Sequence, residues 1–467
     1  MVFSSLFFLY LFLPLCVICY AATKKNRYRN AVLIIFSLIF YAWGEPLCVF
    51  ILIISAALNY ILAFAIDKYR GKLMGKLAVF FAVFFDLAVL GIFKYSGFIA
   101  ENLNALLPLN LPVPDIKLPI GISFYTFQII SYVIDCHWEK VSVQKSFPKF
   151  LMYVSLFPQL VAGPIVRYST IESEISSRRT TLDDLSSGVS RIAVGLAKKV
   201  ILANNLNIIV EAFFGSDIKN LSVTGTWYAV IIYAMQIYFD FSGYSDMAIG
   251  LGRIFGFHFD ENFNYPFICK DVSEFWQRWH ISLSTFFRDY LLYVPIFGKR
   301  RKYGGLFLVW FCTGLWHGSS WNYIIWGLYF GMFIFIEQLI GKKKMKKIPL
   351  AVRHIYNKIV IIIGFGIFYF EDLSRLGDFF KNLIGLNSNS FIDEFTKLSV
   401  TNNLYLIIIA VICCFPVAKV IQNLAKKNIG FSYTIAASRV AVNIALLLVS
   451  SILLVDATNN PFLYFRF

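Results

Sequence analysis

The chain has 467 residues, of which 58% are hydrophobic and 15% are charged, and its formal net charge is +16. Soluble domains contain roughly 45–50% apolar and about 25% charged residues, so this composition excludes a water-soluble protein. The basic excess does not indicate a nucleic-acid partner, because Lys and Arg stand in short segments between apolar runs, as the positive-inside rule requires.

Long, almost uncharged runs recur along the chain, and several approach the roughly 20 residues that a helix needs to cross a hydrocarbon layer of about 30 Å. They predict an all-α, polytopic integral membrane bundle of about nine to twelve transmembrane helices, with shorter re-entrant or interfacial helices between them. The runs cover residues 2–22, 46–66, 77–93, 226–239, 306–339, 359–370, 404–415 and 440–455.

The first run has basic residues after it and none before it, so we expect a retained helix that ends in the cytoplasm, not a cleaved signal peptide. With residues 24–29 inside, a helix over residues 31–43 runs outward, and the next helix returns residues 68–76 to the cytoplasm. The fourth helix then exits. Residues 101–117, which are poor in basic side chains, are therefore predicted to lie outside.

Between Pro119 and Tyr303 the segments carry more polar, Gly and Pro residues. In a membrane, such backbone is tolerated only where protein or a water-filled cavity surrounds it, so we expect the functional centre here. One membrane domain over residues 1–467 is the simplest division. It comprises N-terminal packing helices over 1–100, a functional core over 119–340 and C-terminal packing helices over 355–467.

Two carboxylates, Asp240 and Asp246, interrupt an apolar span. At this spacing they lie about 120° apart on an ideal helix of about 3.6 residues per turn. They therefore do not form a facing acid/base pair unless Gly243 breaks the helix. We expect each to orient a histidine or to pair with an arginine.

Large apolar side chains recur at helical spacing on both sides of His280, at Trp276, Trp279, Leu283, Phe286 and Tyr290. This pattern predicts an interfacial amphipathic helix with an aromatic belt. The sequence leaves open whether His280 is catalytic or orients a substrate.

The apolar run over residues 306–340 would measure about 52 Å as one straight helix at about 1.5 Å per residue, far more than a membrane needs. Both flanks are strongly basic, and Gly314, Gly318, Ser319 and Ser320 offer a natural break. We favour a broken or hairpin arrangement over a single long tilted helix.

His317 lies beside that break, within Phe-Cys-Thr-Gly-Leu-Trp-His-Gly-Ser-Ser-Trp. An ionisable group inside an apolar span is costly and is a functional candidate by default, and imidazole suits general-base catalysis near neutral pH. Further along the run, the Gly327-x-x-x-Gly331 pattern predicts close helix packing.

No metal site is expected, because none of the eight cysteines forms a pair with a partner pair at zinc-like spacing. The chain also has no phosphate-binding Gly loop and no Gly-x-Ser-x-Gly elbow. Sequence motifs alone therefore identify no cofactor-binding residue.

Several long motifs resemble the membrane-bound O-acyltransferase family, and specifically its bacterial alginate O-acetyltransferase branch. They are Pro-Ile-Gly-Ile-Ser-Phe-Tyr-Thr-Phe-Gln from Pro119, Phe-Pro-Gln-Leu-Val-Ala-Gly-Pro-Ile-Val-Arg from Phe157, and the segments 238–250, 262–290 and 311–321. The opening residues 1–14 and the closing residues 460–467 match as well, so the resemblance covers essentially the whole chain.

This resemblance implies a helical bundle with a central funnel or tunnel that meets an essential histidine, which maps onto His317. A second family position, Asn or His, maps onto His280. It also implies transfer of an acetyl group from cytoplasmic acetyl-CoA towards hydroxyls of an exported cell-surface polysaccharide, at the bacterial cytoplasmic membrane. An extracytoplasmic SGNH-hydrolase-like partner would complete the transfer.

Residues 293–305 lack the double-Gly-Asn-Arg that usually follows Tyr-Ile-Pro-Leu in the family, so no detailed roles carry over to this loop. Its basic residues 299–302 could meet the phosphates of CoA, although the positive-inside rule explains them equally well. Two other functions remain open. They are D-alanyl transfer from a carrier protein to teichoic acid, and glycan or lipid transport without catalysis.

Overall fold

The computed structural model describes residues 1–161, 163–215, 217–292, 294, 301–387, 389–425 and 429–455. These residues form helices joined by turns and loops, without a strand among them. The all-α, polytopic class predicted from the apolar runs is confirmed for this part of the chain.

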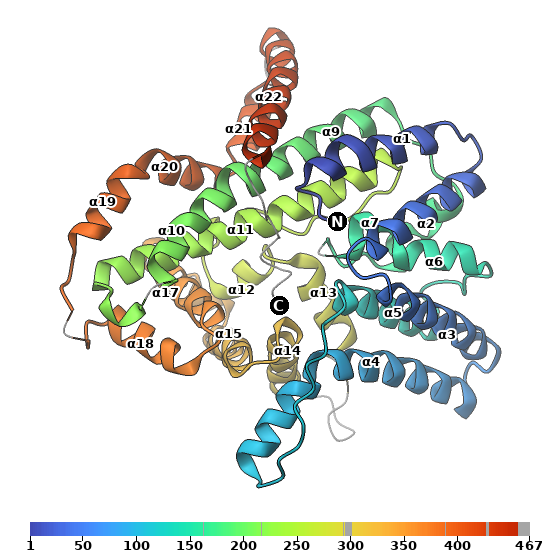
Figure 1. Ribbon diagram of the computed structural model, residues 1–467, viewed down its shortest axis with the longest axis horizontal. Helices are drawn as coiled ribbons and strands as arrows, with labels where there is room; N and C mark the ends of the chain where they lie inside the picture. The colour runs from blue at the N-terminus through green and yellow to red at the C-terminus, as the bar shows by residue number, and fades with distance from the viewer. Residues whose placement is uncertain are drawn as a thin grey trace. The chain divides into compact units, whose positions relative to one another are not determined.

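Helices follow one another closely along the chain (Figure 1). In order they are α1 (Leu13–Ala21), α2 (Asn26–Ala42), α3 (Cys48–Lys68), α4 (Leu73–Leu106), α5 (Ile122–His137), α6 (Phe147–Ser155), α7 (Phe157–Leu160), α8 (Tyr168–Ser176), α9 (Leu182–Ala197), α10 (Asn204–Phe214), α11 (Val223–Ile254), α12 (Val272–Trp276), α13 (Ile281–Tyr290), α14 (Lys302–His317), α15 (Trp321–Ile340), α16 (Lys342–Met345), α17 (Leu350–Tyr369), α18 (Leu373–Leu383), α19 (Glu394–Asn402), α20 (Leu404–Cys413), α21 (Val417–Ala425) and α22 (Ile429–Val455). Two π-helical turns, η1 (Phe8–Phe12) and η2 (Lys198–Ala203), precede α1 and α10, and 3₁₀ turns cover Ile218–Asn220 and Pro266–Ile268.

Among the described residues, six helices are long and apolar enough to cross a membrane, or seven if the bent pair of α19 and α20 counts as one span. This number is smaller than the predicted nine to twelve. One reason is that some predicted crossings form short helices: the helix predicted over residues 31–43 lies in α2, which has 17 residues, and the first part of the run over 306–339 lies in α14, which has 16. At about 1.5 Å per residue, such helices fall short of a layer of about 30 Å.

The described residues group into two compact units. Unit 1 comprises Met1–Ile192 and Tyr244–Glu261, and unit 2 comprises Ala193–Gly243 and the described residues from Asn262 to Val455. The boundary falls within helices α9 and α11. This grouping concerns packing only, so the division into a functional core and two sets of packing helices stays a prediction.

In unit 1, α3 and α4 pack against each other, and both pack against α5 (Figure 1). A polar contact joins the first two helices, because the Asn59 amide donates to Oδ1 of the buried Asp86 carboxylate at 2.9 Å. Helix α4 continues to Leu106, so residues 101–106 of the segment predicted to lie outside are helical. The remaining residues 107–117 form an irregular connection.

The charge pattern predicts opposite sides of the membrane for the two ends of α4. In intact cells, an impermeant thiol reagent should label an Asp115→Cys variant and leave a Lys76→Cys variant unlabelled. Both positions are exposed, so accessibility within the protein does not bias the comparison. The unsubstituted chain gives the background from its native cysteines, and permeabilised cells should label both variants. Labelling of Lys76→Cys alone in intact cells would reverse the topology.

In unit 2, α14 and α15 form the predicted hairpin, with the break at Gly318–Ser320. The ring of Tyr303 near the start of α14 contacts Phe335 near the end of α15, so the helices are antiparallel. A Cβ atom on Gly327 would lie 2.3 Å from the carbonyl oxygen of Trp310. Only glycine allows this approach, so the predicted close packing at Gly327 is confirmed and a single long helix is wrong.

The segment around His280 departs from the predicted amphipathic helix. Helix α12 ends at Trp276, α13 begins at Ile281, and His280 between them has φ +45° in the left-handed region. Trp276 is buried against the rings of Trp310 and Phe330, at centroid distances of 4.8 and 4.9 Å. The predicted continuous helix is therefore wrong at the break before Ile281, and its aromatic side chains pack into the core of unit 2 instead of forming an exposed belt. Residues 281–290 are helical as predicted, and their place at a membrane interface stays a prediction.

Candidate active site

His317 is the last residue of α14, and its side chain is buried, with 6% of the residue's surface exposed. Aromatic rings surround it. The ring centroids of Trp316, Trp326 and Phe368 lie 5.0, 4.9 and 5.2 Å from that of the imidazole. The hairpin brings Trp326 from α15, and α17 supplies Phe368. An imidazole in such surroundings is shielded from water, which strengthens its interaction with any polar group beside it.

His280 lies in the same aromatic cluster, although 37 positions separate it from His317 in the sequence. Its ring centroid is 4.6 Å from that of Phe241 on α11 and 5.7 Å from that of Trp316. The indole of Trp316 therefore contacts both predicted site residues. Burial lowers the pKa of His280 to about 3, so its imidazole is neutral at physiological pH.

Asn262 holds His280 in place. Its Oδ1 atom lies 3.1 Å from His280 Nδ1 and accepts hydrogen bonds from Ser282 N at 3.2 Å and Ser282 Oγ at 2.9 Å. The main-chain oxygen of Asn262 also accepts from Ile281 N at 2.9 Å. One side chain thus fixes the imidazole and the first turn of α13 together. Asn262 is fully buried, with 0% of its surface exposed.

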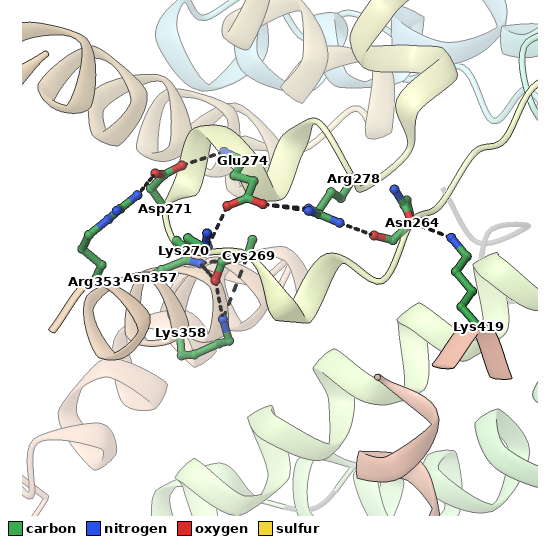
Figure 2. Close-up of polar contacts among 10 residues, drawn as sticks. All are labelled: Asn264, Cys269, Lys270, Asp271, Glu274, Arg278, Arg353, Asn357, Lys358 and Lys419. Carbon is green, nitrogen blue, oxygen red and sulfur yellow. Dashed lines mark hydrogen bonds and ion pairs between the residues drawn. The ribbon is translucent and has the colours of Figure 1, made fainter. Parts of the chain in front are cut away.

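Polar contacts anchor the loop over residues 262–280 to the rest of unit 2 (Figure 2). At its base, Asn264 N donates to the main-chain oxygen of Arg278 at 2.9 Å, and Arg278 Nη1 donates back to the main-chain oxygen of Asn264 at 3.1 Å. Arg278 also pairs with Glu274 at 2.8 Å, and Lys419 of α21 donates to the side chain of Asn264 at 3.3 Å.

Helix α17 holds the other side of this loop (Figure 2). Arg353 pairs with Asp271 at 2.6 Å, and the main-chain oxygen of Cys269 accepts from Asn357 Nδ2 at 2.9 Å and from Lys358 Nζ at 3.1 Å. These contacts hold the segment that leads into α12, and those of Arg278 hold the segment that follows it, so the chain before His280 is supported on both sides of α12.

The start of α12 is capped by two carboxylates. Asp271 accepts from Glu274 N at 3.0 Å, as an N-cap residue does. Glu337, buried on α15, accepts from Val272 N at 2.7 Å and from Ser273 N at 2.9 Å. Negative charge at a helix N-terminus is stabilising, because free backbone N–H groups and the helix dipole both point there.

The two aspartates of α11 pair with basic side chains, and the expected arginine partner is found for Asp246, whereas Asp240 pairs with a lysine. Asp246 accepts from Arg191 at 2.8 Å, which confirms an arginine partner. Asp240 pairs instead with Lys199 on the π-helical turn η2, at 2.5 Å. Helix α11 runs unbroken through Gly243, so the two carboxylates do not face each other.

Sequence reasoning missed Asn262, Trp316 and Lys199 as contributors to this region. A signal existed for Lys199, because it is a cation within an apolar run, the same criterion that singled out His317. Asn262 had no periodic signal, since it acts through a loop. Of the basic residues 299–302 considered for CoA, residues 299 and 300 lie outside the described part of the chain, as does most of the atypical 293–305 loop before Arg301.

Comparison with known proteins gives one consistent match. Residues 35–376 match the model of the membrane-bound O-acyltransferase family. The chain is 35% identical to a probable alginate O-acetylase of Pseudomonas putida, over 100% of both chains. It is 30% identical to a peptidoglycan O-acetyltransferase of Helicobacter pylori over 84% of this chain and 81% of that one. A teichoic acid D-alanyltransferase of Bacillus subtilis is 31% identical over 49% of this chain and 62% of its own.

Proposed function

The chain belongs to the membrane-bound O-acyltransferase family and is an O-acyltransferase, and on this premise we propose that it moves an acetyl group from cytoplasmic acetyl-CoA towards hydroxyls of an exported cell-surface polysaccharide. The observation that carries the proposal is the match to an alginate O-acetylase along the entire chain. The protein is a multi-pass integral membrane protein, and we place it in the cytoplasmic membrane of a bacterium.

In this proposal His317 is the general base. A ring nitrogen takes the proton of the acceptor hydroxyl as the hydroxyl oxygen attacks the carbonyl carbon of the thioester. The C–O bond forms, the C–S bond breaks, and the proton passes to the departing sulfur of CoA. The burial of His317 in an aromatic cluster supports the role, because a site without bulk water favours direct proton transfer over exchange with solvent.

His280 would position one of the substrates in the same cluster, with the donor and acceptor meeting there through a central funnel or tunnel. Acetyl-CoA must arrive from the cytoplasm and the acceptor hydroxyl, on the glycan or on the partner that passes the acetyl group to it, from the other face, so a passage from both sides is required. The basic residues 299–302 would meet the phosphates of CoA on the cytoplasmic side. An extracytoplasmic SGNH-hydrolase-like partner would deliver the acetyl group to the polysaccharide.

Two other functions, D-alanyl transfer and transport, can be distinguished from acetyl transfer. The teichoic acid D-alanyltransferase matches only about half of this chain, whereas the alginate O-acetylase matches all of it, and this difference favours acetyl transfer. A transporter of glycans or lipids would also contain buried polar residues, but it would need no single histidine for turnover.

The deciding experiment supplies acyl donors to the purified full chain in proteoliposomes, with the host's own base-deacetylated polysaccharide as acceptor. Acetyl-CoA labelled in the acetyl group should release CoA, and a D-alanyl-loaded carrier protein should give no transfer. Turnover of the D-alanyl carrier alone would replace the proposal with the teichoic acid activity. Glycan movement without consumption of either donor would indicate a transporter.

A further inference from the structure

Asn262 contacts both the imidazole of His280 and the first turn of α13. We propose that Asn262 holds His280 in the tautomer that carries its proton on Nδ1, so that the Nε2 lone pair accepts a hydrogen bond from a substrate. The hydrogen-bond donor would be the hydroxyl that receives the acetyl group or an amide N–H of the CoA arm. This inference rests on the proposed function, since it assigns the role of a second residue at the same site.

The first step is the orientation of the Asn262 amide. The backbone N–H of Ser282 can only donate, and it lies 3.2 Å from the atom assigned as Oδ1. The nitrogen of the amide at that position would place two donors against each other. The Asn262 oxygen therefore faces Ser282 and His280, and this assignment follows from chemistry that a flipped amide cannot satisfy.

The second step follows from the first. The Asn262 oxygen lies 3.1 Å from His280 Nδ1 and can only accept, so this bond forms when Nδ1 carries the proton. The Ser282 hydroxyl also lies near Nδ1, at 3.5 Å, but it donates its proton to the same Asn262 oxygen at the shorter distance of 2.9 Å. In a neutral imidazole the other nitrogen, Nε2, then has a lone pair and no proton. The neutral form is favoured because His280 is 1% exposed and lies against the rings of Phe241, Phe263 and Trp316.

The third step concerns Nε2 itself. This atom is buried and has no hydrogen-bond partner within the described part of the chain. Buried polar atoms are almost always satisfied, so one that is not calls for a missing partner. The missing partner must be a donor, because Nε2 offers only a lone pair. Both the acceptor hydroxyl and the amides of the CoA arm meet this requirement.

The backbone is arranged to keep this geometry. His280 has φ +45° and ψ +55°, a left-handed conformation that non-glycine residues adopt only where the surroundings impose it. The contacts of Arg278 and Asp271 before His280 and the hydrogen bond from Ser282 N to Asn262 after it supply that constraint (Figure 2 shows the first two). Strain held by a rigid loop is typical of residues whose placement serves function.

The direct test is the ¹⁵N spectrum of histidine-labelled full chain in detergent, because the two tautomers place their nitrogen resonances far apart. The chain has five histidines, and loss of one set of signals in His280→Gln assigns the resonance. We expect a protonated Nδ1 and an unprotonated Nε2 at neutral pH. A protonated Nε2 in the unsubstituted protein would overturn the proposal, whether or not the protein turns over acetyl-CoA.

Activity provides the second test. Asn262→Ala should lower acetyl-CoA turnover by about tenfold or more, because the imidazole can then take the other tautomer, a change that costs a triad histidine about 10⁴-fold in kcat. The matched control is Asn402→Ala, the same change at an exposed position at the end of α19, outside the candidate site, which should leave turnover within about twofold. Equal effects of the two variants would overturn the proposal.

Asn262→Asp gives a signature that a purely structural role would not produce. The carboxylate still accepts from Nδ1, but its negative charge favours the imidazolium and raises the pKa of His280. Nε2 is then protonated at low pH and can no longer accept, so turnover should fall on the acid side, with an inflection absent from the unsubstituted protein. An unchanged pH profile at reduced activity would contradict the proposal.

The KM values for the two substrates identify which of them donates the hydrogen bond to His280 Nε2. A raised KM for the glycan alone in Asn262→Ala indicates the acceptor hydroxyl, and a raised KM for acetyl-CoA alone indicates the CoA arm. A fall in kcat with both KM values unchanged would overturn ground-state binding at Nε2. If the unsubstituted protein turns over no acetyl-CoA, the proposed function fails, while the ¹⁵N spectrum still decides the tautomer.

Discussion

His317→Ala is expected to abolish acetylation of the surface glycan while the protein still reaches the membrane at normal levels. The imidazole stands at the last residue of α14 and packs against rings from α14, α15 and α17, so alanine, which is a good helix former, should leave the hairpin in place. General acid/base catalysis typically contributes about 10²–10⁴-fold, enough to lower acetylation below detection in cells. The measurement is the acetyl content of purified glycan, taken beside the membrane abundance of the variant.

His317→Gln is the sharper variant, because glutamine keeps bulk and hydrogen bonding without a nitrogen that titrates near neutral pH. His258→Gln serves as the control. That histidine is exposed, contacts Glu174 and Asp184 in unit 1, and should leave acetylation unchanged. Near-normal acetylation by His317→Gln at matched abundance would make His317 structural and place the chemistry on another residue.

The hairpin around His317 could be predicted because its causes are local. The apolar run is too long for one crossing, and the break has glycine and serine at consecutive positions. Gly327 was predictable for the same reason, since close helix packing requires a small residue at a fixed spacing. In each case the sequence within a few turns of the helix carries the information that determines the structure.

The break at His280 could not be predicted, because its causes are distant in sequence. Periodicity predicted a helix through residues 276–290, yet Glu337 caps α12 from another helix and Asn262 accepts hydrogen bonds from the start of α13. These tertiary contacts favour a left-handed residue where local propensity favours a continuous helix. In the candidate site, the local sequence therefore determines the position of His317, and tertiary contacts determine that of His280.

The ion pair between Lys199 and Asp240 is expected to be essential for stability. Their side chains are 5% and 3% exposed, and Nζ lies 2.5 Å from Oδ1. Lys199→Met removes the cation and keeps most of the volume, but it leaves a buried carboxylate without its lysine. Breaking a buried pair in this way costs about 3–5 kcal/mol, so the variant should unfold at a lower temperature in detergent and accumulate poorly in membranes.

The double variant Lys199→Met with Asp240→Leu separates charge from packing. Replacing both charges by apolar side chains of similar volume is often neutral, because the desolvation cost of each ion disappears together with their attraction. Thermal unfolding followed by tryptophan fluorescence should therefore place the double variant near the unsubstituted protein and well above Lys199→Met. If the double variant is as unstable as the single one, the two side chains matter for packing or for other contacts, and their pairing does not govern stability. If the stable double variant loses acetyl-CoA turnover, the pair also serves the reaction, because stability alone no longer explains the loss.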